Sequence, residues 1–357
     1  MMEKVLMKGT EAIGVGAIRS GCKIYCGYPI TPQSELLAYL AKELPQIEGA
    51  SFIQSESEIA AINMIYGAAG TGARAMTSSS SPGISLKQEG ISYIAGAELP
   101  CVIINASRGG PGLGSIQPAQ SDYFQATKGG GHGDYRMIVL APKSVQEMYD
   151  YTFVAFDLAD KYRTPVMLMC DGALSQLMEP VVLSDTKVVQ YEKNWATTGA
   201  KGRKPVLVSS LRIEPAELEE HVDHLFEKYA EIMKNEVRYE SVCNEKTEYV
   251  VVAYGIMARI AQTAISKLRQ EGIEIGLIRP ITLWPFPQQA FAELSDKVKL
   301  FITLELNKGQ MVEDVRLAVN GKKEVTFYGR CGGMLPTPDE IAEVIKSKIS
   351  GVKKCNK

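Results

Sequence analysis

Short apolar runs alternate with stretches of helical spacing through the first half of this 357-residue chain. The apolar runs have the length of strands and are followed by turns rich in glycine, proline or serine. We expect strands at 23–26, 51–54, 73–77, 100–105, 137–141 and 165–170, and helices at 8–20, 33–44, 58–71, 84–97 and 144–162. Repeated strand-then-helix units with apolar strands predict a parallel sheet covered by helices on both faces.

The pattern changes after about Pro180 and then resumes. Residues 185–245 are charged and interrupted by proline, and they resemble a linker with one helix at 214–236. In the resumed part we expect strands at 249–254, 274–280, 298–305 and 324–328, and helices at 259–271, 287–294, 310–319 and 338–349. The sequence therefore predicts two doubly wound α/β domains with parallel sheets, at 1–184 and 248–357, joined by a linker at 185–247.

Composition narrows the class of protein. Hydrophobic residues make up 45% and charged residues 22%, which is the balance of a globular protein. Because 39 basic residues face 41 acidic ones, no basic field is present to attract nucleic acid. The N-terminus has no apolar segment of the secretory type, and no apolar run approaches the ~20 residues of a membrane span. We expect a cytoplasmic protein that binds neither nucleic acid nor membranes.

Cysteine and histidine spacing argues against a metal or redox centre in this chain. The seven cysteines, at 22, 26, 101, 170, 243, 331 and 355, are irregularly spaced, and none forms the C-x2-C-x2-C run of an iron–sulfur site. The close pair Cys22 and Cys26 is typical of buried thiols. His221 and His224 lie three residues apart in a charged helical segment, which is more typical of a solvated face than of a zinc site.

Four turns follow neighbouring strands and carry the polar residues of the first domain. They are Gly27–Pro32, Gln54–Glu58, Ser78–Gly83 and Asn105–Gly114. Ligands of open parallel sheets bind outside the carboxyl ends of the strands. Each turn alone could be a rigid connection or a helix cap, but four of them at one sheet edge predict a ligand site.

Three charged residues in these turns could carry chemistry. Glu56 precedes a helix and can simply favour the positive end of its dipole. Glu58 is followed by small residues that would bury its carboxylate, and a buried carboxylate needs a partner or a use for its proton affinity. Arg108 precedes a glycine-rich loop, where it could hold a carboxylate substrate or lie in solvent. The residues alone leave both readings of Arg108 open.

Taken together, the motifs match a known family. GYPITP, QSESE, TSSSSPG and NASRGGPG, in this order, resemble the alpha subunit of 2-oxoacid:ferredoxin oxidoreductases. The resemblance continues through AYGIMARIAQTAISKLRQEGIEIGLIRPITLWPFP, LELNKGQMVEDVRL and GRCGGMLPTPDEI. The branched-chain type, which oxidises 3-methyl-2-oxobutanoate, is the most similar, and the 2-oxoglutarate type is next. The implied fold is a pyrimidine-binding domain for thiamine diphosphate, followed by a domain like the C-terminal domain of transketolase.

The resemblance also implies roles for individual residues. Glu58 matches the glutamate that hydrogen-bonds N1′ of the cofactor's aminopyrimidine and so activates it. Thr31 matches a threonine near the substrate, and Arg108 matches the arginine that contacts the substrate carboxylate. The residues implied to surround the cofactor are Tyr28, Pro29, Ile30, Thr31, Glu58 and Ser81. Those implied to surround the substrate are Thr31, Arg108, Gly109 and Gly110.

A missing motif implies partner subunits. In this family a GDG motif and a later asparagine pair hold the diphosphate and its Mg²⁺, whereas this sequence has only GHGD at 131–134 and CDG at 170–172. The resemblance therefore implies a hetero-oligomer with a diphosphate-binding beta subunit and an iron–sulfur subunit. This assembly would convert a 2-oxo acid and coenzyme A to acyl-CoA and CO₂ and would reduce ferredoxin.

Other functions and one structural question stay open at this stage. A non-redox thiamine enzyme of the transketolase type would normally carry GDG in the same chain or a close partner. A nucleotide-binding module is disfavoured because GVGAIRSG at 14–21 lacks the dinucleotide spacing and lies in a helical pattern. The glycines that follow Arg108 could leave room for a branched acyl chain, or they could only shape a turn.

Overall fold

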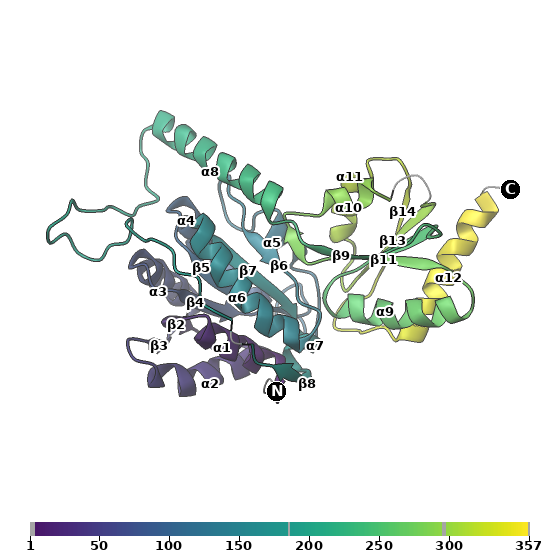
Figure 1. The fold of residues 1–357 in the computed structure, drawn as a ribbon, viewed down its shortest axis with the longest axis horizontal. Helices are drawn as coiled ribbons and strands as arrows, with labels where there is room; N and C mark the ends of the chain where they lie inside the picture. The colour runs from purple at the N-terminus through teal and green to yellow at the C-terminus, as the bar shows by residue number, and fades with distance from the viewer. Residues whose placement is uncertain (1–3, 185, 295–297, 356–357) are drawn as a thin grey trace.

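The computed structural model describes residues 4–184, 186–294 and 298–355, which form two α/β domains (Figure 1). The first domain is built on a seven-stranded sheet with the order β12-β6-β7-β5-β4-β2-β3. Its strands are β2 (Ile24–Gly27), β3 (Ser51–Gln54), β4 (Ala75–Ser79), β5 (Cys101–Ser107), β6 (Ile138–Leu140), β7 (Pro165–Asp171) and β12 (Thr282–Trp284). All neighbours pair in parallel except β12 and β6.

Helices cover both faces of this sheet, and the burial pattern of β5 shows why. Val102 and Ile104 point into the core shared with α1, α2 and α6, whereas Cys101 and Ile103 point into the core shared with α3 and α4. The helices are α1 (Gly9–Arg19), α2 (Ser34–Glu43), η1 (Leu44–Gln46), α3 (Glu58–Gly70), α4 (Ser81–Gly96), α5 (Tyr123–Thr127), α6 (Val145–Tyr162) and α7 (Gly172–Gln176). A separate ribbon pairs β1 (Lys4–Lys8) with β8 (Met178–Val182).

The second domain repeats this architecture on a smaller scale. Its sheet has the order β14-β13-β10-β11-β9, and only β9 is antiparallel to its neighbour. The strands are β9 (Tyr239–Val242), β10 (Tyr249–Val252), β11 (Ile275–Pro280), β13 (Leu300–Glu305) and β14 (Glu324–Gly329). The helices are α9 (Gly255–Gln270), α10 (Gln288–Ala292), α11 (Met311–Val319) and α12 (Pro338–Cys355). The expected fold class of two doubly wound domains is therefore confirmed.

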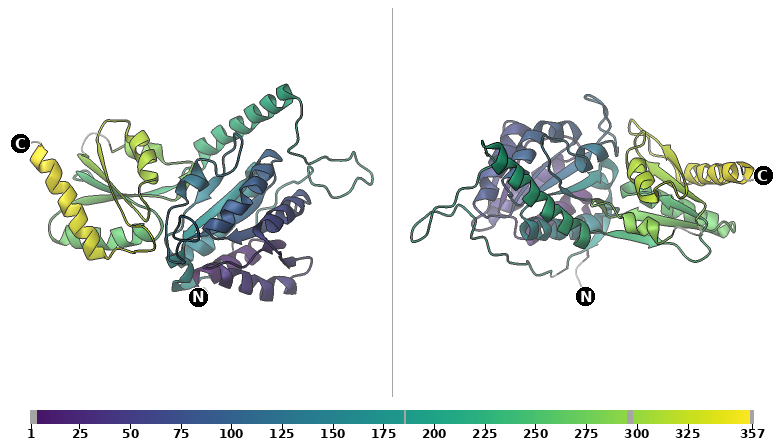
Figure 2. Two further views of the ribbon diagram at one scale, coloured as in Figure 1. Left: turned by 180° about the vertical axis from the view of Figure 1, so that it is seen from behind. Right: turned by 90° about the horizontal axis from the view of Figure 1, so that it is seen from above.

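A long connection runs between the domains. The described residues between 183 and 214 form neither helix nor strand, and they project from the first domain (Figures 1 and 2). The expected helix follows as α8 (Pro215–Asn235). It packs on the end of α4, where His221 Nε2 lies 2.7 Å from the Gly96 carbonyl oxygen. None of the helices in the described ranges is long and apolar enough to cross a membrane.

Several expected boundaries were wrong for physical reasons. Ser78 and Ser79 belong to β4 rather than to a turn, because α4 begins at Ser81 with Pro82 in its first turn. β9 lies in the expected linker but pairs with β11, and β12 lies in the expected second domain but pairs with β6. Such pairings depend on tertiary contacts, which periodicity does not report. The division into domains at 184 and 248 stays a prediction. β9 and β12 each pair with a strand that lies beyond one of these predicted boundaries.

Candidate active site

The four polar turns meet at one edge of the first sheet, as expected. They follow β2, β3, β4 and β5, which are neighbours in the order β5-β4-β2-β3. Since these strands are parallel, their carboxyl ends lie at the same edge. The turns therefore form one continuous rim, and the candidate residues of the sequence analysis lie on it.

Arg108 is held inside this rim and is not a solvated loop residue. Only 8% of its surface is exposed. Its Nη1 donates a 2.9 Å hydrogen bond to the Thr31 carbonyl oxygen, and its Nη2 lies 3.5 Å from the Leu113 carbonyl oxygen. Its Nε is buried and has no partner in the described part of the chain. The structure thus brings Arg108 and Thr31 together and leaves the buried Nε–H of Arg108 without a partner in the described ranges.

Ser81, the first residue of α4, ties the Arg108 loop to that helix. Its hydroxyl accepts a 2.9 Å hydrogen bond from the Arg108 backbone N–H and donates one of 2.6 Å to Asp122 Oδ2. Asn105 Nδ2 donates to the same carboxylate oxygen at 2.9 Å. Burial raises the pKa of the Asp122 carboxyl, while hydrogen bonds from side chains such as Ser81 and Asn105 oppose that rise. The contacts of Ser81 here are structural, and its expected contact with a cofactor stays a prediction.

Glu58 begins α3 and is buried, as its small neighbours suggested. Ser57 caps the helix by accepting a 3.1 Å hydrogen bond from the Ala60 N–H. The Glu58 side chain is 5% exposed, whereas Glu56 is exposed. It packs against α4 at Gly83, where a Cβ atom would lie 2.5 Å from Glu58 Oε1. No donor within the described ranges hydrogen-bonds the Glu58 carboxylate, so its oxygens are available to a ligand.

Lys87 is a buried charge that the sequence analysis missed. It is 0% exposed, and its Nζ donates a 2.9 Å hydrogen bond to Thr77 Oγ1 of β4. Burial lowers its pKa to about 8, and attraction to the Glu58 carboxylate is the largest effect that opposes this. Its position was a usable signal, because it lies one helical turn after Gly83 and so on the face that packs against Glu58.

The GYPITP turn presents its residues outward from a fixed base. Tyr28, Pro29 and Thr31 are exposed, and Ile30 is half-buried. Beneath them, the buried Gln33 donates from Nε2 to the Tyr28 carbonyl oxygen at 3.0 Å and accepts a 2.6 Å hydrogen bond from Ser78. The turn is therefore anchored from below, and its upper face is free to contact a ligand.

The glycines after Arg108 divide between the two expected roles. Gly112 and Gly114 have φ values of +69° and +57°, so these two shape the turn. A Cβ at Gly114 would also lie 1.9 Å from the Gly109 carbonyl oxygen. A Cβ at Gly110, by contrast, would meet nothing within 4 Å. Gly110 is itself exposed, so this space opens to solvent, and its role in holding a branched acyl chain stays a prediction.

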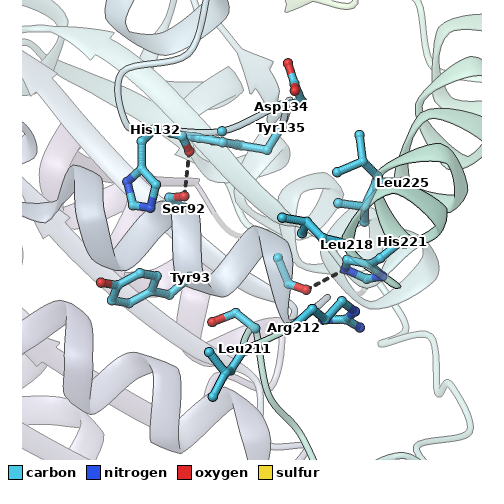
Figure 3. Close-up of a pocket in the computed structure, with 14 residues that line it drawn as sticks. Ser92, Tyr93, His132, Asp134, Tyr135, Leu211, Arg212, Leu218, His221 and Leu225 are labelled. Atoms are coloured by element: carbon cyan, nitrogen blue, oxygen red, sulfur yellow. Dashed lines mark hydrogen bonds between the residues drawn. The ribbon is translucent and has the colours of Figure 1, made fainter. Parts of the chain in front are cut away.

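Cavities beside the first domain include one at the rim and one away from it. One, of about 460 Å³, lies beside the GYPITP turn and is lined by Thr31, Pro32 and Gly172 and, from the second domain, by Leu335. The other, of about 500 Å³, lies between α4, the 131–135 loop and α8 (Figure 3). It contains His221, which is occupied by its contact with Gly96. No cluster of three or more metal-binding side chains occurs in the described ranges.

Comparison with known proteins identifies the family of this chain. Residues 15–242 match the family model described as pyruvate flavodoxin/ferredoxin oxidoreductase, thiamine diphosphate-binding. The chain belongs to the 2-oxoacid:ferredoxin oxidoreductase family. Residues 247–341 match the model of pyruvate:ferredoxin oxidoreductase core domain II, so the second domain belongs to the same family. The resemblance seen in the motifs is confirmed, and this oxidoreductase subunit carries a thiamine diphosphate-binding domain.

The relatives of this oxidoreductase subunit are themselves named as subunits of enzymes. The chain is 50% identical to ketoisovalerate oxidoreductase subunit VorB of Methanothermobacter thermautotrophicus, over 97% of this chain and 98% of the relative. It is 35% identical to 2-oxoglutarate synthase subunit KorA of Methanocaldococcus jannaschii, over 96% of this chain and all of the relative. Family membership excludes the nucleotide-binding module and the non-redox transketolase as functions.

Solved structures agree with this assignment. The 2-oxoglutarate:ferredoxin oxidoreductase from Magnetococcus marinus, with 2-oxoglutarate, coenzyme A and succinyl-CoA bound, superposes with a TM-score of 0.87 at 27% identity. The match covers 98% of this chain but 66% of that longer chain. A split gene transketolase, an inactive beta4 tetramer, has a TM-score of 0.60 at 15% identity, which shows a shared fold alone.

Proposed function

We propose that this chain supplies the aminopyrimidine side of the thiamine diphosphate site in an enzyme that oxidises 3-methyl-2-oxobutanoate. With coenzyme A the products are the acyl-CoA and CO₂, and ferredoxin is reduced. The observation that carries the proposal is the buried Glu58 carboxylate, which accepts no hydrogen bond from the part of the chain that the structure describes and shares a sheet edge with Arg108.

The residues of this rim fit the cofactor. Gly83 leaves space against Glu58 Oε1 that any larger side chain would fill. The hydroxyls of Ser79 and Ser80, at the carboxyl end of β4, are buried without partners in the described ranges and could pair with a polar ring. The exposed Tyr28 and Pro29 and the half-buried Ile30 offer a turn on which an aromatic ring could pack. Thiamine diphosphate, when bound, supplies the electron sink that decarboxylation of a 2-oxo acid needs.

Glu58 would hold and move a proton. A carboxylate at the N-terminus of α3 has its negative charge stabilised by the helix dipole, and its burial keeps water from competing for it. It could therefore accept a hydrogen bond from the protonated N1′ atom and orient the ring. No other carboxylate of the QSESE turn is suited to this, because Glu56 is exposed.

Arg108 and Thr31 would orient the substrate. The unpartnered Nε–H of Arg108 can donate to a carboxylate, and the hydrogen bond from Nη1 to Thr31 fixes the plane of the guanidinium. Gly109 and Gly110 come next in the chain, and the open volume at Gly110 suits a branched acyl chain. The preference for 3-methyl-2-oxobutanoate is also supported by the 50% identity to ketoisovalerate oxidoreductase subunits, against 33–36% to 2-oxoglutarate synthase subunits.

The remaining parts of the enzyme would come from partners. The relatives are named as subunits, and this sequence lacks the GDG motif that its family uses for the diphosphate. We place Mg²⁺ on a diphosphate-binding beta subunit and the clusters on an iron–sulfur subunit that passes electrons to ferredoxin. A cytoplasmic location is supported by the six cysteines whose side chains the structure describes, all of which are unpaired. The side chain of Cys355 lies outside the described residues.

The test is a viologen-reduction assay on the assembled complex with three acids: pyruvate, 2-oxoglutarate and 3-methyl-2-oxobutanoate. We expect kcat/KM for 3-methyl-2-oxobutanoate to exceed that for pyruvate by roughly 10- to 200-fold, the range that one filled apolar position gives. A preference for 2-oxoglutarate would contradict the branched-chain assignment and favour the 2-oxoglutarate type of the enzyme. Absence of activity with all three acids would contradict the proposed reaction itself.

A further inference from the structure

Lys87 lies directly beneath the proposed site and has no role in the function described so far. It projects from α4 into the core between that helix and the sheet, and none of its surface is exposed. A buried ammonium is costly unless it is paired. A methionine of similar length would fill this space without that cost, so the charge itself requires an explanation.

The surroundings of Lys87 leave one group that can compensate for its buried positive charge. Thr77 of β4 accepts the hydrogen bond from Nζ but carries no charge. The titratable groups that act on Lys87 are Glu58 of α3, Cys26 of β2 and Cys101 of β5. Burial raises the pKa of both thiols, to about 11 and about 12, so both are neutral at pH 7. Glu58 is thus the anionic partner: its Oε1 packs against Gly83, one helical turn before Lys87 in α4. The attraction acts through space, because no hydrogen bond joins the two side chains in the described ranges.

We propose that Lys87 is a positioning residue for Glu58, whose buried ammonium stabilises the Glu58 carboxylate from within the core and so sets how strongly that carboxylate attracts the N1′ proton. This inference rests on the proposed function of Glu58. A positive charge close to an acid–base pair makes loss of the shared proton easier. Removing it should therefore raise the apparent pKa of the pair formed by Glu58 and N1′.

The decisive comparison uses variants that separate charge from hydrogen bonding. Lys87→Gln removes the charge but can still donate to Thr77, whereas Lys87→Met removes both. In the assembled complex with thiamine diphosphate and Mg²⁺, the protonation of N1′ is followed against pH by near-ultraviolet circular dichroism of the bound cofactor. We expect the midpoint to rise by about one pH unit or more in both variants, as for loss of an opposite charge at close range. Cofactor affinity, measured by calorimetry, should change little.

A double-mutant cycle separates this inference from the function on which it rests. In a Glu58→Gln complex, adding Lys87→Gln should move the N1′ midpoint no further. If Glu58→Gln itself leaves the midpoint unchanged, the proposed function of Glu58 is wrong. If Glu58→Gln moves the midpoint but Lys87→Gln does not, Lys87 is structural and the inference is overturned. The same holds if Lys87→Met moves the midpoint and Lys87→Gln does not.

The unmodified complex provides a second measurement that needs no folded variant. Lys87 loses its proton near its lowered pKa of about 8, so its influence on the N1′ signal should disappear over that pH range. We expect the N1′ titration to be broader than that of an isolated group, because the pKa of the pair rises as Lys87 loses its charge. A curve with the shape of a single isolated group would contradict the inference even if the neutral variants failed to assemble.

Discussion

At the scale of single residues, Arg108 shows how the rim is ordered before a substrate arrives. Its side chain donates to the Thr31 carbonyl oxygen, and its backbone N–H donates to Ser81 Oγ. Because both the backbone and the guanidinium of Arg108 are held, the side chain loses little further conformational entropy when it binds a carboxylate. Arg108 was recognisable from its neighbours in the sequence, but its burial and its pairing with Thr31 were not, because they depend on how two distant turns meet.

The first prediction concerns the two glutamates of the QSESE turn. Glu58→Gln keeps the shape of the side chain but removes the carboxylate that would stabilise a protonated N1′. In the assembled complex, we expect hydrogen–deuterium exchange at C2 of the cofactor to slow by at least ~10²-fold, as when a positioned acid–base group is lost.

Glu56→Gln is the matched control, because Glu56 is two residues away and exposed. Its exchange rate should stay close to that of the unmodified complex. An inactive Glu56→Gln complex beside an active Glu58→Gln complex would reverse the assignment of the two residues.

At the scale of secondary structure, α3 and α4 determine where the buried charges lie. The α3 boundary was predictable, since Ser57 is a good N-cap and apolar helical spacing follows it. The start of α4 was not, because four consecutive serines gave no single capping position and the fold selects Ser80. That error of three residues left Gly83 outside the expected helix, so its spacing of one helical turn from Lys87 was not used.

The second prediction concerns the N-cap of α3. Ser57→Ala removes the hydrogen bond to the Ala60 N–H and should lower the free energy of unfolding by about 1 kcal/mol. Because α3 begins at the next residue, fraying of its first turn should also slow C2 exchange in the assembled complex.

Ser144 offers a matched control for this change. It caps α6 in the same way, accepting a 3.1 Å hydrogen bond from the Glu147 N–H. Ser144→Ala should cost a similar free energy of unfolding, again about 1 kcal/mol, and leave C2 exchange unaltered. Equal effects of both substitutions on exchange would mean that general destabilisation, and not the placement of Glu58, is responsible.

At the scale of the whole molecule, buried polar contacts join the two domains. Gln120, which is 1% exposed, donates from Nε2 to the Tyr254 carbonyl oxygen and accepts from the Leu306 N–H through Oε1. Asp171, at the end of β7, accepts a 2.9 Å hydrogen bond from the Ile256 N–H at the start of α9. These contacts make the second domain a fixed support for the first.

The third prediction is that Gln120→Ala destabilises the chain by about 1–3 kcal/mol, because it leaves the buried Leu306 N–H without its partner and removes one of the two hydrogen bonds to the Tyr254 carbonyl oxygen. The measurement is denaturant unfolding of the purified chain. Gln146 is a suitable control, since its amide pairs with both backbone groups of Val182 but is only partly buried and lies within the first domain. A Gln120→Ala loss no larger than that of Gln146→Ala would contradict the proposed importance of the junction.

The fourth prediction is that the isolated chain does not bind thiamine diphosphate in the micromolar range. The rim of turns holds groups suited to an aminopyrimidine, but the family motif for the diphosphate is missing from the sequence. Isothermal titration calorimetry of the chain alone should therefore show no saturable heat with cofactor and Mg²⁺, whereas the assembled complex should show it. Tight, Mg²⁺-dependent binding to the lone chain would contradict the division of the site between subunits.

The placement of β12 has a consequence for how the chain folds during synthesis. This strand closes the outer edge of the first sheet by pairing with β6, although about 140 residues separate the two in the sequence. The edge of β6 therefore stays open on the ribosome until residues 282–284, which follow β11 of the second domain in the sequence, have been translated and released. An open strand edge is a site for pairing with other chains. Ribosome-bound intermediates that end before Thr282 should accordingly depend on chaperones, and release of residues 282–284 should end that dependence.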